Sequence, residues 1–541
     1  MKSNTILFGL SVLFLPALAL GQTQKAAVTP IMAGKSIATV PTESGQVRGY
    51  IHNGTFTFKG IPYAKANRFE APTKPDSWTG VRSSMTYGPV CPMDVTTSTN
   101  DEFEFPFHHD WGYTNENCLS LNVWTPQLTA AQKRPVMVWL HGGGFTGGSS
   151  VELPSYDGEN LTKKGDVVVV TVNHRLNVLG FLDLSAYGDK YKNSPNAGLM
   201  DLVSALQWVK QNIDQFGGDP NNVTIFGQSG GGAKVTSLMN APSAKGLFHK
   251  AIVQSGSYLT SFTESDLAKK VSAALLAELN LQPSQVDSLQ KISYERLNEA
   301  GKKALRKVGE SMKAEGRPTF GLGWGPIHDG TFLPYQLTEP AAMALSKNIP
   351  LLVGSTKNEF APFMPGTRDL SMDAAKANLQ KKYGDKTEAY LAAVKKAYPE
   401  TVKPSDYIDF DIMFRTGTIR QAGQKAVAGA APVYAYLFSW QSPVLDGAYK
   451  SMHCMELPFV FDNISRCEEM TGGGKEAHTL ADKMSRAWIA FARTGNPNHK
   501  GLPTWPVYTA ETGSTMIFDT VNQVKKHHDK ELLEIASGKP L

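Results

Sequence analysis

The sequence predicts an α/β protein in which helices flank a mostly parallel central sheet. Apolar runs of strand length recur between helical stretches, at residues 135–140, 167–172, 223–226, 251–254, 349–353 and 432–438. The run from Val167 to Val170 has no polar alternation, which is typical of a strand covered on both faces. Residues 199–216 carry apolar side chains at helical spacing between two of these runs. Strand, helix and strand in this order indicate parallel pairing through right-handed crossovers.

Further segments complete the predicted architecture. Residues 46–50 and 55–59 alternate apolar and polar side chains around Asn53-Gly54, a dipeptide that favours a hairpin turn. Residues 262–318 and 365–430 are charged and helical in pattern, and we expect them to form helical insertions that cap the sheet. No linker rich in Pro, Gly or Ser interrupts the chain. We therefore expect residues 22–541 to form a single domain.

The composition is that of an ordinary globular protein. Of 541 residues, 41% are hydrophobic and 19% are charged, and the formal net charge is +5. Lys and Arg are scattered, with no basic run beyond a short patch such as Lys525-Lys526. A nucleic-acid-binding protein concentrates positive charge on one face, so we expect no nucleic-acid partner.

The N-terminus has the pattern of a secretory signal peptide. Lys2 precedes an apolar stretch from Ile6 to Leu15, and small residues follow as far as Gly21. The alternative is a retained membrane anchor, but the apolar run is shorter than the roughly 20 residues that a span needs. We expect residues 1–21 to be removed and the mature chain to be secreted or periplasmic, with no membrane span.

Export makes the cysteines informative. The chain has four, and an even number in an oxidising compartment suggests pairs. The simplest of the three connectivities joins Cys91 to Cys118 and Cys454 to Cys467; the alternative is four free, buried thiols. No CxxC motif is present and no histidine lies at ligand spacing from the cysteines, so we expect no zinc or other metal.

The strongest chemical signal is Gly227-Gln228-Ser229-Gly230-Gly231, directly after the predicted strand 223–226. A G-x-S-x-G motif at this position places its serine on a tight turn between strand and helix, with the hydroxyl exposed above the sheet. The motif alone is weak in a chain with 49 glycines, and its place after a buried strand makes it specific. Ser229 is therefore the candidate nucleophile.

A second glycine motif follows the predicted strand 135–140. Gly142, Gly143 and Gly144 stand between His141 and Phe145, and three consecutive glycines let a backbone approach a ligand closely. Backbone N–H groups in such a loop can stabilise the negative charge that develops when a serine attacks a carbonyl carbon. The alternative is a flexible turn at a strand end, but two motifs in this order favour an oxyanion-binding loop.

With these motifs in place, the sequence resembles the type B carboxylesterase/lipase family, which includes cholinesterases and bacterial para-nitrobenzyl esterases. The resemblance runs from residues 60–64 to Trp505-Pro506 and includes the segments 117–123, 173–182 and 216–220. It implies an α/β-hydrolase fold with the helical insertions over the active site. It also implies hydrolysis of carboxylic esters through an acyl-enzyme, without a cofactor.

The resemblance assigns the remaining members of a catalytic triad. The family's acid matches Glu359, after the predicted strand 349–353, and its histidine matches His453 in the segment 453–459. Twelve histidines could act as the base, and most lie in polar stretches or in the glycine loop. His328 is the one serious alternative, because the resemblance places its segment beside the acyl pocket.

The resemblance also assigns binding groups. The oxyanion donors are the backbone N–H groups of Gly143, Gly144 and Gly230, and the Cys91–Cys118 disulfide matches the family's first. That disulfide closes an aromatic loop at the rim of the active-site gorge, with side chains Phe103, Phe105, Phe107, Trp111 and Tyr113. Trp111, Trp324, His328 and Gln228 are therefore expected in the substrate pocket.

The chain departs from the family pattern at three positions, none of which belongs to the triad. Gln228 replaces a frequent Glu, Gly230 replaces Ala, and His174 replaces the Tyr of an Asn-Tyr-Arg segment. Because the aromatic loop and the missing carboxylate favour apolar substrates, we expect a small ester that is uncharged and apolar or aromatic. The alternatives are a specialised esterase or lipase for aromatic, plant-derived or polymeric esters, and a non-catalytic binding member of the fold.

Overall fold

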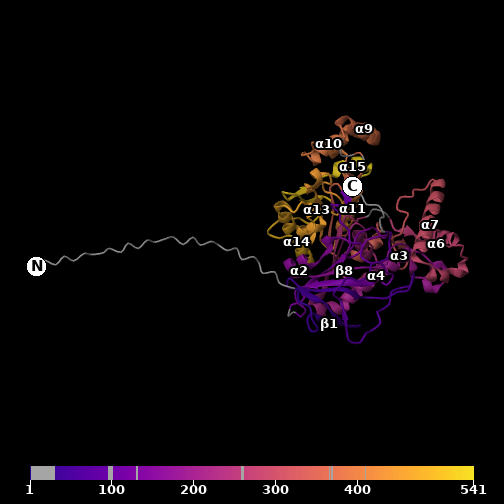
Figure 1. Ribbon diagram of the computed structural model, residues 1–541. Coiled ribbons are helices and arrows are strands. Elements are labelled where there is room, and N and C mark those ends of the chain that lie inside the picture. Colours follow the sequence, from indigo (N-terminus) through magenta and orange to yellow (C-terminus); the bar gives the residue numbers. More distant parts are fainter. Residues whose placement is uncertain are drawn as a thin grey trace.

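An eleven-stranded sheet forms the centre of the computed structural model (Figure 1). The structure describes residues 31–94, 101–129, 132–257, 261–364, 370–408 and 410–541, together with Met1 and Gly366. The predicted signal peptide, residues 1–21, lies outside the described residues apart from Met1. No helix in the described ranges is long and apolar enough to cross a membrane.

The strand order confirms the predicted sheet. Across the sheet the strands are β16 (Gln523–Lys526), β15 (Ser514–Phe518), β14 (Val433–Phe438), β13 (Leu351–Thr356), β10 (Lys250–Gln254), β9 (Gly218–Gln228), β7 (Arg134–Leu140), β8 (Val168–Val172), β6 (Ser120–Thr125), β4 (Thr55–Pro62) and β3 (Tyr50–His52). All neighbours from β15 to β8 pair in parallel, and the strands outside them pair antiparallel. The six predicted apolar runs all form strands of this sheet.

The N-terminal prediction is correct for the turn and wrong for one strand. β3 and β4 form a hairpin through Asn53 and Gly54, which have φ of 47° and 77°, as a primed turn requires. The predicted strand 46–50 is divided, however, because the chain passes between two sheets there. Its first part forms β2 (Gly45–Arg48), which pairs with β1 (Thr39–Thr42) and β5 (Val81–Ser83) in a separate sheet.

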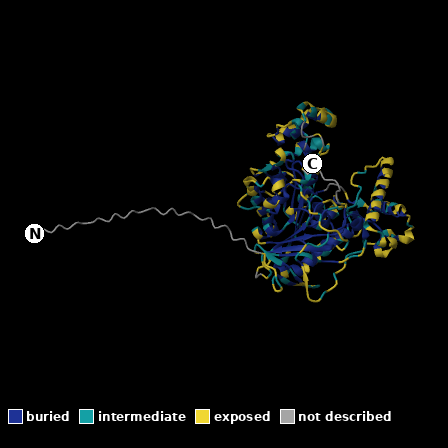
Figure 2. Ribbon diagram, viewed as in Figure 1, coloured by how far each residue is buried: buried dark blue, intermediate teal, exposed yellow. Residues whose placement is uncertain are grey.

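Both faces of the central sheet are buried, as the apolar strands predict (Figure 2). Along β7, Val136 and Val138 enter one hydrophobic core while Met137 and Trp139 enter the other. The first core includes side chains of α4 (Ala197–Asn212) and α5 (Gly230–Met239). The second includes side chains of α2 (Glu159–Gly165) and α14 (Lys475–Thr494). The strand ends, rather than the strand faces, are therefore left to carry chemistry.

The two long insertions are helical, as predicted. The first contains α6 (Ser265–Glu278) and α7 (Tyr294–Ala314), which pack on each other at one side of the molecule (Figure 1). The second contains α9 (Met372–Tyr383), α10 (Thr387–Ala397) and α11 (Phe414–Ala428), of which α10 packs on the C-terminal α15 (Lys530–Ser537). One short strand pair was not predicted, β11 (Thr263–Glu264) with β12 (Ile327–His328).

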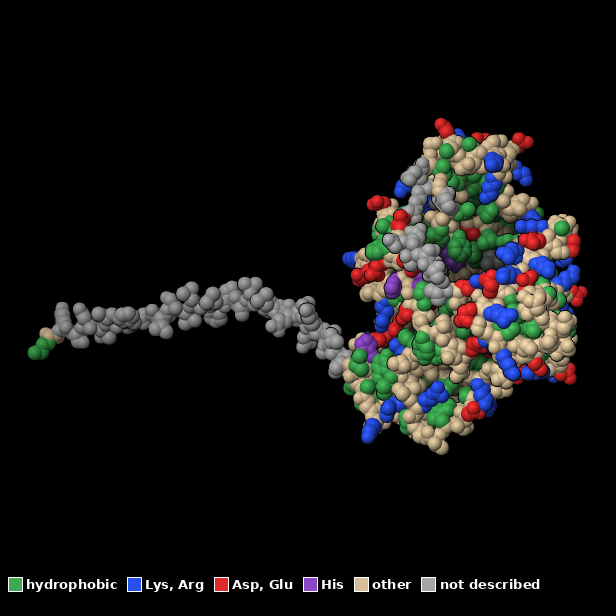
Figure 3. Space-filling model, turned by 45° about the vertical axis from the view of Figure 1, so that its right-hand side comes forward, with side chains coloured by type: hydrophobic (Ala, Val, Ile, Leu, Met, Phe, Trp, Pro, Cys, Tyr) green, Lys and Arg blue, Asp and Glu red, His purple; other side chains and the backbone are tan. Residues whose placement is uncertain are grey.

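Shorter helices fill the remaining described connections: α1 (Asp101–Glu104), α3 (Asn177–Phe181), α8 (Pro340–Ser346), α12 (Leu457–Val460) and α13 (Glu468–Thr471). Figure 3 shows that hydrophobic side chains gather in a hollow on one face, surrounded by charged surface. The site described below opens between connections that follow the carboxyl ends of the central parallel strands.

Candidate active site

Ser229 occupies a strained turn between β9 and α5. Its φ of 57° and ψ of −127° lie outside the regions that a serine ordinarily adopts. The flanking glycines are required by contact, since a Cβ at Gly231 would lie 1.9 Å from the carbonyl oxygen of Leu140 at the end of β7. A Cβ at Gly227 would lie 2.5 Å from the backbone of Gly231. The turn therefore cannot form with larger residues at these two positions.

Two cavities meet at Ser229. One, of about 290 Å³, extends past Phe145, Phe262 and Phe320, and no charged side chain of a described residue lines it. The other, of about 450 Å³, also reaches His453 and is lined by Phe103, Phe107, Trp111, Phe360 and Phe363, and by the carboxyl groups of Asp94 and Glu152. The serine hydroxyl makes no hydrogen bond to another described residue and opens toward this space. An ester could place its two halves on either side of Ser229.

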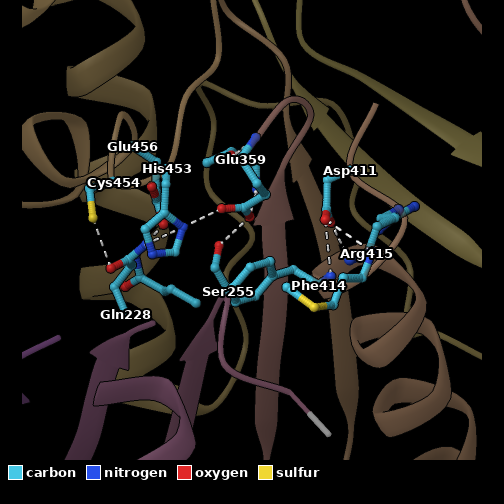
Figure 4. A network of polar contacts seen from close by, with 12 residues as sticks. Gln228, Ser255, Glu359, Asp411, Phe414, Arg415, His453, Cys454 and Glu456 are labelled. Atoms are coloured by element: carbon cyan, nitrogen blue, oxygen red, sulfur yellow. Dashed lines mark hydrogen bonds and ion pairs between the residues drawn. The ribbon is translucent and has the colours of Figure 1, made fainter. Parts of the chain in front are cut away.

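Glu359 and His453 form a buried pair beside this space (Figure 4). His453 Nδ1 contacts Glu359 Oε2 in an ion-pair geometry. The other carboxylate oxygen accepts hydrogen bonds from the Ser255 hydroxyl at 2.6 Å and from the Thr356 N–H at 2.8 Å. These donors hold the carboxylate in one orientation, so that it fixes the plane of the imidazole.

The loops that carry the pair are joined through their backbones. Glu359 follows β13, and His453 follows β14, its neighbour in the sheet. The His453 N–H donates to the Glu359 carbonyl at 3.0 Å, and the Asn358 N–H donates to the Ser451 carbonyl at 3.2 Å. Acid and histidine are thereby held together without relying on their side chains. The chain places Ser229, Ser255, Glu359 and His453 after four adjacent parallel strands, β9, β10, β13 and β14, where ligands bind in open α/β sheets.

The His453 ring is enclosed on several sides. The Phe360 and Phe414 ring centroids lie 4.2 and 5.2 Å from the imidazole centroid. Gln228 is fully buried, and its Nε2 lies 3.3 Å from each ring nitrogen of His453. The Cys454 thiol donates to Gln228 Oε1 at 3.1 Å (Figure 4). Gln228 thus brings an uncharged amide to the His453 ring, at the position where the resemblance to the family gives a frequent Glu.

The glycine loop lies against the turn that carries Ser229. Gly143 and Gly144 have φ of 77° and 60°, so both positions favour glycine. The N–H groups of Gly143, Gly144 and Gly230 donate to no other described residue, and all three glycines line the cavities at Ser229. A Cβ at Gly230 would lie 2.2 Å from the Gly144 carbonyl oxygen. The loop therefore occupies space that an alanine at position 230 would fill.

Three buried carboxyl groups near the site were not predicted from sequence. Burial raises the pKa of Glu152 and of Glu456 to about 7. Burial, together with the charge of Glu359, also raises the pKa of Asp411 to about 7. Asp411 accepts N–H groups of residues 413–415 and so caps α11, which carries Phe414 to the imidazole. No signal in the sequence separates these carboxyl groups from exposed ones.

The predicted pocket residues are only partly brought together. Trp111 lines the larger cavity and stacks on His109 at 4.7 Å. Trp324 and His328 line neither cavity, so their placement in the pocket was wrong. Trp324 is half-buried against Gly301, and His328 pairs with Glu264 at 3.0 Å and contacts the Pro334 carbonyl oxygen. His328 is therefore engaged away from Ser229, while neighbouring Pro326 does reach the smaller cavity.

The structure contains neither predicted disulfide, and all four cysteines are free and buried. Cys91 and Cys118 lie close together, since a hydrogen bond from Cys91 contributes most to raising the pKa of the Cys118 thiol. Cys454 contacts Gln228 instead of Cys467. The local spacing of two cysteines could not show that the Cys454 thiol contacts Gln228, which in turn contacts His453.

No cluster of His, Cys, Asp or Glu that could hold a metal ion occurs in the part of the chain that the structure describes. The described polar groups converge on Ser229 and His453. A serine on a strained strand-to-helix turn, at the carboxyl edge of a parallel sheet, defines an α/β-hydrolase.

The comparison with known proteins makes the assignment narrower. Residues 36–535 match the Carboxylesterase family, and the chain belongs to it. It is 36% identical to a para-nitrobenzyl esterase of Bacillus subtilis, over 91% of this chain and 97% of that protein. It is 35% identical to a cocaine esterase of Homo sapiens, over 87% and 86% of the two chains.

Solved structures agree with these relatives. A structure described as an esterase from Clostridium hathewayi that can hydrolyse aliphatic aromatic polyesters has a TM-score of 0.81 and 38% identity, over 94% of this chain and 99% of that one. A para-nitrobenzyl esterase structure has a TM-score of 0.74 and 35% identity, over 92% and 99%. The protein is a carboxylic ester hydrolase.

The cysteine geometry makes a prediction about covalent structure. Because the Cys454 thiol is directed to Gln228, we expect Cys454 and Cys467 to be unpaired in the purified protein. Alkylation with iodoacetamide in denaturant, without reductant, should label both residues, as read by peptide mass spectrometry. A peptide pair joined through Cys454 and Cys467 would contradict this arrangement.

Proposed function

We propose that this hydrolase acts through a Ser229–Glu359–His453 triad and an acyl-enzyme. The observation that carries the proposal is the convergence of these groups at the ends of β9, β13 and β14. The Glu359–His453 pair borders the same cavity into which Ser229 opens. Serine, acid and histidine also occur in the chain order that this fold uses.

The proposed mechanism follows from the contacts. His453 Nε2 takes the proton of the Ser229 hydroxyl as its oxygen attacks the ester carbonyl carbon. Glu359, held by Ser255 and Thr356, orients the ring through Nδ1 and stabilises the imidazolium. The alcohol leaves with the proton from His453, and water repeats the sequence to release the acid. The N–H groups of Gly143, Gly144 and Gly230 stabilise the oxyanion in both steps.

The cavities support an uncharged substrate with apolar or aromatic groups. The smaller cavity has no charged lining among described residues. In the larger one, Asp94 is paired with Lys302 at 2.9 Å, and burial raises the pKa of the Glu152 carboxyl to about 7. Neither acid therefore offers the uncompensated charge that a cationic alcohol would prefer.

A second candidate is the hydrolysis of aromatic polymeric esters. In the larger cavity Phe103 stacks on Phe107 at 5.5 Å and contacts Phe363 at 5.1 Å, while His109 stacks on Trp111. This row of rings could hold successive aromatic units. The described polyester activity of the similar Clostridium hathewayi esterase supports the same candidate.

We also propose that the enzyme works outside the cytoplasm. The charged, apolar and small-residue regions of the N-terminus support export. Removal of residues 1–21 would leave the family-matched region, residues 36–535, intact.

Ser229→Ala should abolish ester hydrolysis while the protein stays folded. The expected loss in kcat is on the order of 10⁶, as for removal of the nucleophile of a serine protease. The measurement is hydrolysis of nitrophenyl butyrate together with labelling by a fluorophosphonate probe. Ser485→Ala is a matched control, because Ser485 is a buried serine whose hydroxyl bonds within α14. Labelling of folded Ser229→Ala at the normal rate would exclude Ser229 as the nucleophile.

Gln228→Glu should move the rising limb of the pH–rate profile to higher pH. The new carboxylate would lie beside the His453 ring and stabilise its protonated form, so the neutral base would be available only at higher pH. A nearby opposite charge typically changes such a titration by about one unit or more. Gln228→Met, similar in size and uncharged, is the control. If the rising limb of Gln228→Glu and that of Gln228→Met both lie at the wild-type pH, the predicted effect of a charge at position 228 is wrong.

Choline esters should not be preferred over their uncharged isosteres. The ratio of kcat/KM for butyrylcholine to that for dimethylbutyl butyrate should stay below about ten at equal ionic strength. Trp111 is the one tryptophan among the described residues that line the cavity, and a cation–π contact with its ring could reverse this result. Assays with an aliphatic–aromatic polyester film, in parallel with the nitrophenyl esters, separate the two candidate functions. Release of aromatic acid from the film would favour the hydrolysis of aromatic polymeric esters as the function.

A further inference from the structure

A buried lysine contacts the backbone of the glycine loop and lines neither cavity at Ser229. Lys234, on α5, is fully buried, with no exposed surface. Its Nζ donates to the His141 carbonyl oxygen at 2.9 Å and to the Gly142 carbonyl oxygen at 3.3 Å. It also lies 5.6 Å from the centroid of the Phe145 ring. An ammonium group is costly to bury, so its presence under this loop calls for a physical role.

One of the two carbonyl groups that Lys234 binds, that of Gly142, belongs to a peptide unit that faces the site. The C=O of Gly142 and the N–H of Gly143 are the two ends of one planar peptide group. A cation that binds the oxygen end withdraws electron density from the nitrogen end, and hydrogen bonds in a chain strengthen one another. Gly143 N–H is one of the donors that we assign to the oxyanion. The bond at the back of the peptide thus strengthens the donor at its front.

We propose that Lys234 is a positioning residue for ester hydrolysis, which orients and polarises the Gly142–Gly143 peptide so that the Gly143 N–H binds the oxyanion more strongly. This inference rests on the proposed triad and oxyanion loop. It adds to them a charged group that touches neither the substrate nor Ser229.

A counter-charge is built into the same cluster. Glu152 is buried beside the loop, since a Cβ placed on Gly148 would meet the Gly142 oxygen, His141 Nδ1 and Glu152 Oε1 within 3.2 Å. The Tyr156 hydroxyl donates to Glu152 Oε1 at 3.3 Å. The Gly142 carbonyl oxygen that accepts from Lys234 therefore lies beside the same glycine as the Glu152 carboxyl group.

Every titratable group facing Lys234 can be identified. Burial lowers the pKa of Lys234 to about 7, against the opposing effect of Glu152. The pKa values of His141 and His174, whose rings stack at 5.1 Å, lie well below the usual range because both are buried. Burial raises the pKa of Glu152 to about 7 and that of Tyr156 well above its usual value. Among these described neighbours, Lys234 and Glu152 are the two groups whose pKa lies at about 7.

The sign of the pH effect follows. Lys234 is cationic below its pKa, so polarisation of the peptide is complete in acid and is lost as the pH rises through about 7. The base function of His453 changes in the opposite direction, because that group must lose a proton to act. The wild type and a Lys234 variant share His453, so comparing their pH profiles separates the effect of Lys234 from that of His453.

The test is Lys234→Met, which keeps length and burial but has neither charge nor donor. We expect kcat to fall about tenfold with KM changed by less than about twofold, since removing a direct oxyanion donor costs more, 10²–10³ in kcat. Affinity for a trifluoromethyl ketone, which forms an oxyanion adduct with the nucleophile, should fall by a similar factor. The wild-type to variant ratio of ketone affinities should decline as pH rises through neutrality.

Lys425→Met is the matched control. Lys425 is also buried, its Nζ also donates to a backbone carbonyl (Ser346), and burial lowers its pKa to about 8. It lies on α11 and lines neither cavity. Both variants should lose stability, and only Lys234→Met should lose ketone affinity. Equal kinetic losses in the two variants would overturn the inference.

Glu152→Gln tests the same idea with Lys234 in place. Removal of the carboxylate should lower the pKa of Lys234, so the decline in ketone affinity should begin at lower pH than in the wild type. An unchanged pH dependence would overturn the inference even if Lys234→Met did not fold. Hydrolysis by Ser229→Ala at the wild-type rate would instead overturn the proposed function, whatever Lys234 does.

Discussion

The site depends on one close approach of backbone to backbone, between the end of β7 and the turn at Ser229. The carbonyl oxygen of Leu140 occupies the space where Gly231 would carry a side chain, and the Gly144 carbonyl does the same at Gly230. These contacts place Ser229 and the glycine loop side by side. The cost is a strained serine, which surrounding packing must maintain. The neighbouring strands β9 and β10 contribute to this packing, because the Ser229 N–H donates a hydrogen bond to the Gln254 carbonyl oxygen at the end of β10.

The histidine side of the site is built differently. Backbone hydrogen bonds join the loops after β13 and β14, so Glu359 and His453 meet through main chain as well as side chain. Around them, burial raises the pKa of three other carboxyl groups, those of Glu152, Glu456 and Asp411, to about 7. Glu359 accepts donors on both oxygens, from Ser255, Thr356 and His453. Asp411 is also buried with donors on both oxygens, but its donors are backbone N–H groups at the start of α11. Contact with the His453 ring distinguishes the proposed triad carboxylate from Asp411.

The departures from the family pattern concentrate at this junction. Gln228 brings an amide to both ring nitrogens of His453, and Gly230 leaves room for the Gly144 carbonyl. Lys234 continues the same helix and binds the loop from behind. All three residues lie within seven positions of one another, where β9 passes into α5. Changes in this short segment therefore reach the proposed base, the proposed oxyanion donors and Lys234 together.

The sequence by itself determined the sheet, the strand-to-helix turn and the glycine loop, because each depends on local patterns: apolar runs, helical spacing and glycine at fixed offsets. The strand at 46–50 was misassigned because its division depends on which of two sheets each half joins. Only the tertiary structure decided that Cys454 faces Gln228, that His328 is engaged by Glu264, and that Lys234 and Glu152 are buried together. These contacts join residues distant in the chain, and their burial sets protonation in a way that no local pattern encodes.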